Sequence, residues 1–153
     1  MGSVSLRKVI EKMKLENLTP EIDVSSIRIT QPDINRPALQ MAGYFEHFDA
    51  TRLQIIGFVE YTYMEGLSEE TKREVYQELM SYDIPCIVFC RELKPDPIFL
   101  ETAIAQHVPV LSTKKSTSAF MAEIIRWLNV KLAPCISVHG VLAALVSQRL
   151  RWS

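Results

Sequence analysis

The sequence lacks the glycine spacing that nucleotide-binding loops require. It has five glycines in 153 residues, and none of them falls in the patterns G-x-G-x-x-G or G-x-x-x-x-G-K-[ST]. Such loops need glycine because backbone N–H groups must approach a phosphate closely. This absence argues strongly against ATP or NAD chemistry within the chain. The glycines are Gly2, Gly43, Gly57, Gly66 and Gly140.

Metal-ligand spacing is missing as well. No two of the three histidines stand three or four residues apart, and no second cysteine pair or histidine pair accompanies the three cysteines. The cysteines lie in apolar surroundings, which favours reduced thiols in a core. We therefore expect no metal site. The residues concerned are His47, His107, His139, Cys86, Cys90 and Cys135.

The chain also has little net charge and no long apolar run. Its 17 basic and 18 acidic residues leave a formal charge of −1, so nothing favours nucleic acid or an anionic membrane as a partner. No apolar run approaches the ~20 residues of a membrane-spanning helix, and residues 1–16 contain no apolar signal-peptide core. We expect a cytoplasmic protein that binds neither nucleic acid nor membrane.

What the sequence does contain is a regular alternation of helix and strand patterns. Amphipathic helices alternate with strands that are apolar on both faces, which is typical of a mostly parallel sheet with helices on both sides. With 48% hydrophobic and 23% charged residues, the chain fits one compact α/β domain. We expect helices at 5–14, 37–45, 68–82, 96–107 and 116–132, and strands at 27–30, 52–61, 84–90, 108–113 and 134–142.

Polar residues mark the starts of several of these helices. Side chains that can accept a hydrogen bond from a free helix N–H group stand just before the apolar patterns. The expected N-caps are Ser5, Ser68, Asp96 and either Ser116 or Thr117.

A second group of structural residues lies between 33 and 45. Pro37 suits the first position of a helix, and Gly43 suits its end. A salt bridge between Asp33 and Arg36 can fix the turn before this helix.

The polar loop after the strand 108–113 holds two lysines and several hydroxyl groups. It either caps the next helix and leaves its lysines in solvent, or binds an anion at the helix N-terminus. Helix capping is the favoured interpretation. The candidate ligand-binding residues are Ser112, Thr113, Lys114, Lys115, Ser116 and Thr117.

His139 stands beside Gly140 near the end of the last expected strand. Ligand groups gather at the carboxyl ends of strands in open α/β sheets, so His139 is a site candidate. A hydrogen-bonded structural histidine explains the position equally well. The domain is expected to cover residues 1–142, and residues 143–153 form a divergent tail that is helical, frayed or of artificial origin.

Five segments in order resemble the amino-terminal domain of bacterial HPr kinase/phosphorylase. They are DINRPALQMAGYF (33–45), RLQIIGFVEYTYM (52–64), IPCIVFCRELKPDPIFLETA (84–103), VPVLSTKKSTS (108–118) and LAPCISVHGVL (132–142). The resemblance covers residues 6–142 and rests on the order and spacing of these segments.

The resemblance implies an enzyme for the parent family. Such an enzyme is a homohexamer that phosphorylates a serine of HPr with ATP or pyrophosphate and Mg²⁺, removes that phosphate by phosphorolysis, and controls carbon catabolite repression. Its catalytic domain follows HGVL and carries the P-loop and metal ligands, which are missing from this chain. HPr would be a partner only through that missing domain.

For this chain the resemblance implies specific residue roles. His139 occupies a family active-site position that is not functional alone, whereas Asp33, Arg36, Pro37, Gly43 and Gly140 belong to structural motifs. The fold should resemble the UDP-sugar-binding amino-terminal domain of Mur ligases.

Three alternative functions are open for the chain. The first is a non-catalytic regulatory or assembly domain without a cofactor of its own. The second is a module that binds a sugar phosphate or nucleotide-sugar. The third is a homo-oligomerisation domain, to which the apolar tail with Leu150 and Trp152 would contribute.

Overall fold

The computed structural model describes residues 2–134. The expected strand 134–142, including Cys135, His139 and Gly140, and the tail 143–153 lie outside the described residues, apart from Pro134. The boundary at residue 142 therefore stays a prediction.

A five-stranded sheet forms the centre of the domain. Its strand order is β2-β7-β6-β5-β4, in which β4 to β7 are parallel and β2 pairs antiparallel with β7 at one edge. A separate antiparallel pair joins β1 to β3. The strands are β1 (Val4–Ser5), β2 (Glu16–Asn17), β3 (Arg28–Ile29), β4 (Ile34–Asn35), β5 (Leu53–Ile56), β6 (Ile87–Phe89) and β7 (Val110–Ser112).

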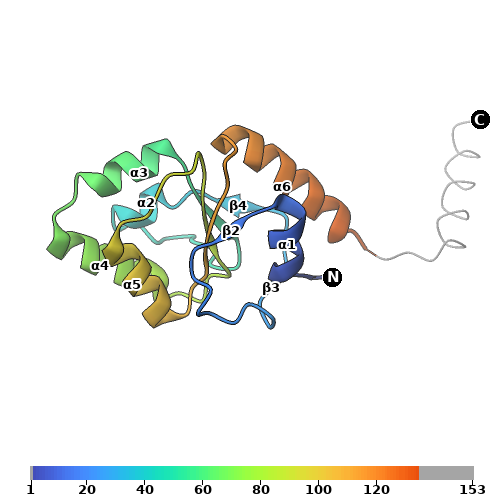
Figure 1. Cartoon of the computed structure of the whole chain (residues 1–153), viewed down its shortest axis with the longest axis horizontal. Helices are drawn as coiled ribbons and strands as arrows, with labels where there is room; N and C mark the ends of the chain where they lie inside the picture. Colours follow the sequence, from blue (N-terminus) through green and yellow to red (C-terminus); the bar gives the residue numbers. More distant parts are fainter. Residues whose placement is uncertain (1, 135–153) are drawn as a thin grey trace, which may run out of the picture.

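Six helices within residues 2–134 cover the two faces of this sheet. Figure 1 shows α1 and α6 together on one side and α2 to α5 on the other. The predicted three-layer α/β architecture with a mostly parallel sheet is therefore confirmed. The helices are α1 (Leu6–Met13), α2 (Ala38–Met41), α3 (Phe58–Glu65), α4 (Glu69–Met80), α5 (Pro97–Gln106) and α6 (Thr117–Lys131).

The sheet separates two hydrophobic cores. Val88 of β6 packs into the core beneath α1 and α6, whereas its neighbours Ile87 and Phe89 pack into the core beneath α4 and α5. Successive side chains of a strand point to opposite faces, so a strand buried on both sides must be apolar at every position. This explains why the apolar run at 84–90 predicted a central strand correctly.

The predicted N-caps are confirmed. The side chains of Ser5, Ser68 and Ser116 accept hydrogen bonds from backbone N–H groups three residues later, at 3.2, 3.2 and 3.3 Å. Asp96 does the same for Phe99 at 2.8 Å. Each cap satisfies one of the N–H groups that a helix leaves without a partner at its start.

The strand predicted at 52–61 is wrong in its second half. Strand β5 ends at Ile56, and helix α3 begins at Phe58. The cause is that a helix starts in this segment, although its aromatic and β-branched residues favour a strand. The Glu60 carboxylate accepts a hydrogen bond from the Gly57 N–H at 2.7 Å, in the manner of a capping-box glutamate.

The segment 33–45 is partly as predicted. Pro37 is the N-cap of α2 rather than its first residue, and the helix ends at Met41, earlier than expected. Gly43 follows with a φ of +98°, a conformation that favours glycine.

In residues 2–134, no helix is long and apolar enough to cross a membrane.

Candidate functional site

The carboxyl ends of four parallel strands meet at one edge of the sheet. Arg36, Gly57 and Thr113 directly follow β4, β5 and β7, in that order. Arg91 is the second residue after the end of β6. This edge is where ligands usually bind in open α/β proteins. It is therefore the place to look for a site in this fold.

The predicted loop at 112–117 is fixed to the end of β6 by its backbone. The Arg91 N–H donates to the Lys115 carbonyl at 2.9 Å, and the Glu92 N–H donates to the Thr113 carbonyl at 3.0 Å. The Thr113 hydroxyl accepts from the Lys115 N–H at 3.2 Å. These three bonds give the loop one defined path across the strand ends.

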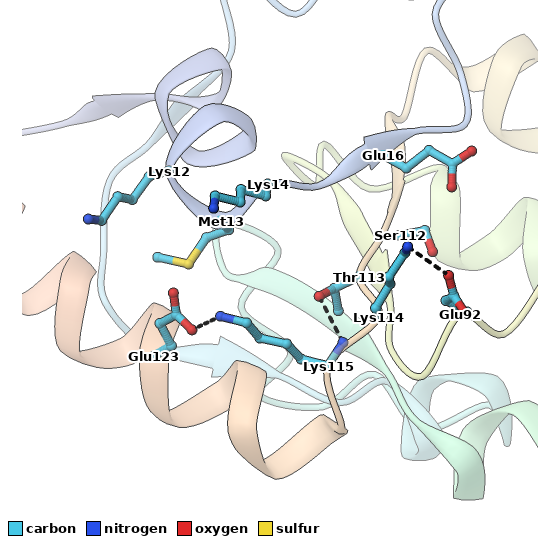
Figure 2. Close-up of a pocket in the computed structure, with 10 residues that line it drawn as sticks. All are labelled: Lys12, Met13, Lys14, Glu16, Glu92, Ser112, Thr113, Lys114, Lys115 and Glu123. Carbon is cyan, nitrogen blue, oxygen red and sulfur yellow. Dashed lines mark hydrogen bonds and ion pairs between the residues drawn. The ribbon is translucent and has the colours of Figure 1, made fainter.

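One end of the loop lines a cavity of about 460 Å³, which we call the lysine cavity (Figure 2). Lys114 lies 3.8 Å from Glu92, and Lys115 forms an ion pair with Glu123 of α6. Both loop lysines are thus partly neutralised by carboxylates. The lining residues are Lys12, Met13, Lys14, Glu16, Glu92, Ser112, Thr113, Lys114, Lys115 and Glu123.

The other end of the loop faces a different cavity, which we call the arginine cavity. Its volume is about 540 Å³. It is lined by Arg36, Phe58, Val59, Arg91, Thr117, Ser118 and Met121. The structure therefore divides the predicted ligand-binding set: Ser112 to Lys115 line the lysine cavity, Ser116 is a helix cap, and Thr117 lines the arginine cavity.

Arg36 does not pair with Asp33, contrary to prediction. Its Nε and Nη2 atoms donate to the Glu60 Oε1 atom at 3.1 and 2.9 Å. Asp33 instead lies 3.9 Å from Arg52. The pairing differs because α3 brings the buried Glu60 next to the end of β4. Arg36 and Glu60 are distant in the sequence, so the sequence alone does not reveal their contact.

Gly57 allows the strand ends to approach one another. A Cβ atom at this position would lie 2.5 Å from the Thr117 Oγ1 atom and 2.7 Å from the Arg36 Nη2 atom. Any side chain would therefore displace Thr117 at the start of α6 and Arg36 after β4. Sequence reasoning missed Gly57, Glu60 and Arg91. A glutamate three residues after a possible N-cap was the available signal for Glu60.

The two cysteines in residues 2–134 are not arranged for reactivity. Cys86 and Cys90 are free and buried. Burial raises the pKa of the Cys90 thiol to about 11, although the Thr117 hydroxyl and the Arg36 charge partly oppose the shift. Burial raises the pKa of Cys86 further. In the described part of the chain, no group of three or more His, Cys, Asp and Glu residues could hold a metal ion.

Comparison with known families gives one match over most of the chain. The family model described as "HPr Serine kinase N terminus" matches residues 4–128. An HPr kinase/phosphorylase of Lachnoclostridium phytofermentans is 56% identical over 142 residues, which cover 93% of this chain and 46% of that protein. An HPr kinase/phosphorylase of Alkaliphilus metalliredigens is 37% identical over the same shares. The chain spans about half the length of these curated relatives.

A solved structure shares the fold. It contains the CBS and DRTGG domains of the regulatory region of a Clostridium perfringens pyrophosphatase, complexed with the activator diadenosine tetraphosphate. The TM-score is 0.56 at 15% identity, over 88% of this chain and 51% of that one. At this identity the likeness concerns the fold alone. The predicted similarity to Mur ligases stays a prediction.

Proposed function

The chain belongs to the family of HPr serine kinase amino-terminal domains, and from this premise we propose that it is a non-catalytic regulatory and assembly domain of the HPr kinase/phosphorylase type. The observation that carries the proposal is the family match over residues 4–128. The 153 residues contain no glycine-rich phosphate loop, which also supports the proposal. Phosphoryl transfer depends on the positioning and charge stabilisation that such a loop and its metal ligands supply.

Three of the four cationic side chains near the strand ends have carboxylate partners, and Arg91 is the exception among the described residues; this pairing also favours a non-catalytic role. Arg36 is bound to Glu60, and the two loop lysines are paired with Glu92 and Glu123. The carboxylates partly offset the charge of these groups and leave less of it to stabilise charge that develops in a transition state. ATP or pyrophosphate, Mg²⁺ and HPr would bind to the catalytic part of such a protein.

The role of His139 stays a prediction that depends on the family. A histidine beside a transferring phosphate can stabilise charge or handle a proton. It would need the phosphate-binding lysine and the metal of a catalytic domain to contribute to turnover.

Exposed apolar side chains on α2, on α3 and at Tyr44, which follows α2, support the assembly part of the proposal. Leu39 is 61% exposed and Val59 is 64% exposed. Contiguous exposed apolar side chains commonly mark protein–protein contacts. We define this apolar surface as Leu39, Tyr44, Phe58, Val59 and Tyr63. We propose that it contacts a second copy of the chain in a homo-oligomer.

Sedimentation of two matched variants tests the assembly proposal. Leu39→Asp should shift the chain toward monomer, because it places a charge in the apolar surface. Val130→Asp is the control, since Val130 is 70% exposed on α6 at the opposite face of the sheet. Assembly that is unchanged by Leu39→Asp, or an unsubstituted chain that is strictly monomeric, argues against this surface.

A domain exchange tests the whole proposal. Residues 4–128 would replace the matching segment of the Lachnoclostridium phytofermentans relative, which is 56% identical to the chain. We expect the chimera to keep the relative's assembly state and its HPr phosphorylation. A folded chimera that has lost both would contradict a shared domain role.

The lysine cavity stays a predicted site for a sugar phosphate or nucleotide-sugar. The ion pairs of Lys114 and Lys115 weaken the case for direct phosphate contacts, because the two glutamates would repel a phosphate bound beside them. Thermal shift with such ligands is the simplest check, since a ligand that binds the native state must stabilise it.

A further inference from the structure

The arginine cavity differs from the lysine cavity in its charge. Its seven lining residues include two arginines and no carboxylate, whereas the lysine cavity contains four lysines and three glutamates. The lining of the arginine cavity comes from the ends of β4 and β6 and from the starts of α3 and α6. It thus lies at the edge of the sheet where ligands usually bind in open α/β proteins, and no carboxylate lines it.

Arg36 is held in a fixed orientation by Glu60. Its Nε and Nη2 atoms are bound to Glu60, whose side chain is only 3% exposed, while the Arg36 side chain is 36% exposed. Within residues 2–134 the Nη1 atom has no hydrogen-bond partner. The buried glutamate therefore orients the guanidinium plane and leaves one donor edge for a ligand, although it also offsets the charge of Arg36.

Arg91 supplies the charge that Glu60 does not offset. Its backbone takes a left-handed conformation with a φ of 59°, and its N–H is fixed to the Lys115 carbonyl. The side chain is exposed and forms no ion pair with any residue that the structure describes. Because the backbone of Arg91 is already fixed, its unpaired guanidinium can bind a phosphate with little backbone reorganisation.

The first turn of α6 adds backbone donors. Ser116 caps the Ala119 N–H, so the Thr117 and Ser118 N–H groups remain at the start of a 15-residue helix, and both residues line the cavity. Gly57 keeps this turn close to Arg36, because a Cβ atom there would collide with both Thr117 and Arg36. The helix N-terminus, the arginines and the glycine therefore form one cradle.

The remaining wall is apolar. Phe58 is 59% exposed and Val59 is 64% exposed, and Met121 of α6 lies with them in the lining. The cavity volume of about 540 Å³ lies in the range of small-molecule sites. An inorganic phosphate would leave this wall unused.

We propose that the arginine cavity binds a small organic phosphate. Its phosphate group contacts Arg36, Arg91 and the first turn of α6, and its organic part packs on Phe58 and Val59. The proposal requires only the fold and the cavity, so it stands independently of the regulatory role proposed above. The shared chemistry is the phosphate ester, and its organic part can be a sugar or a nucleoside.

Titrations of the ¹⁵N-labelled full chain distinguish these sources. The probes are inorganic phosphate, glucose 6-phosphate with glucose as its control, and AMP with adenosine as its control. We expect a phosphate ester to shift the amide signals of Arg91, Thr117 and Ser118, and the unphosphorylated control to shift none of them. The preferred ester identifies the organic part. Equal binding of inorganic phosphate and both esters would overturn the role given to Phe58 and Val59.

Matched variants locate the site. Arg91→Ala should weaken binding about tenfold or more, the effect of losing one charge-assisted hydrogen bond to phosphate. Arg126→Ala on the exposed side of α6 is the charge-matched control, and Lys114→Ala tests the lysine cavity. Binding that survives Arg91→Ala, is lost in Lys114→Ala, or cannot be detected with any phosphate at millimolar concentration would overturn the proposal.

Discussion

At the scale of single residues, Gly57 and Glu60 determine the geometry of the strand ends. Glu60 is buried, and its Oε1 atom receives hydrogen bonds from the Gly57 N–H and from Arg36. Gly57 in turn has no room for a side chain between Thr117 and Arg36. These two residues connect β4, β5, α3 and α6 at one point.

Gly57→Ala should lower the free energy of unfolding by ~1–3 kcal/mol, as expected for overpacking at a closely packed position. Thr117→Ala in the same chain should recover part of the loss, because it removes the Oγ1 atom that a Cβ would meet at 2.5 Å. Urea denaturation measures both effects.

Gly66→Ala is the matched control for this prediction. A Cβ atom at Gly66 would lie 3.6 Å from its nearest neighbour, and the φ of −78° suits alanine. Its effect should be neutral or stabilising by up to ~1 kcal/mol. Equal losses at Gly57 and Gly66 would refute the crowding argument.

The raised pKa values of the buried thiols predict that they react slowly with thiol reagents. With a pKa of about 11, Cys90 would be only ~0.1% thiolate at pH 8, and the thiolate is the reactive form. In a Cys135→Ser variant, Cys86 and Cys90 should resist Ellman's reagent at pH 8 and react quickly in urea. Labelling should rise with pH, because the thiolate fraction grows as pH approaches the pKa. Complete labelling of the folded protein within minutes would show that the thiols are accessible.

At the scale of elements, sequence pattern succeeds where a helix or strand is determined by its own residues. The caps at Ser68 and Asp96 and the apolar strand at 84–90 are of this kind, since hydrogen bonds three residues apart and burial on both faces leave a local signature. The sequence therefore predicted the layers and most of the helices.

The elements that sequence reasoning missed depend on distant partners. Strands β1, β2 and β4 have two residues each and exist through pairing with β3, β7 and β5. Phe58 and Val59 looked like strand residues but open α3, because Gly57 and Glu60 form its start. The arginine cavity was missed for the same reason, since its residues converge from four elements.

The start of α5 allows a sharp test at this scale. Asp96 caps Phe99, accepts a hydrogen bond from the Tyr76 hydroxyl at 2.8 Å and lies 3.6 Å from Lys72. Asp96→Ala should therefore cost ~2–4 kcal/mol, because it also leaves the buried tyrosine hydroxyl without a partner. Adding Tyr76→Phe should restore part of this loss.

Ser68→Ala is the control, since Ser68 caps α4 at an exposed position. It should cost ~1 kcal/mol, the usual value of a cap alone. If thermal unfolding gives the same loss for Asp96→Ala and Ser68→Ala, the contact between α4 and α5 through Tyr76 contributes nothing beyond capping.

At the scale of the whole molecule, the sheet buries one core on each face and still leaves two features at its surface. The apolar surface on α2 and α3 suits a partner, and the arginine cavity beside it suits an organic phosphate. Phe58 and Val59 belong to both features, so a ligand and a neighbouring subunit would contact the same residues. On the two proposals above, a bound ligand and a neighbouring subunit would compete for this wall, and that competition would couple ligand binding to assembly.

The central claim is that this chain acts without catalysis of its own. Intact-mass spectrometry of HPr, incubated with the purified chain, Mg²⁺ and either ATP or pyrophosphate, tests it most directly, with the full-length Lachnoclostridium phytofermentans relative as the positive control. The account predicts that the relative converts HPr to its phosphorylated form while HPr incubated with the chain keeps its unmodified mass. Phosphorylation of more than one HPr molecule per chain would contradict it.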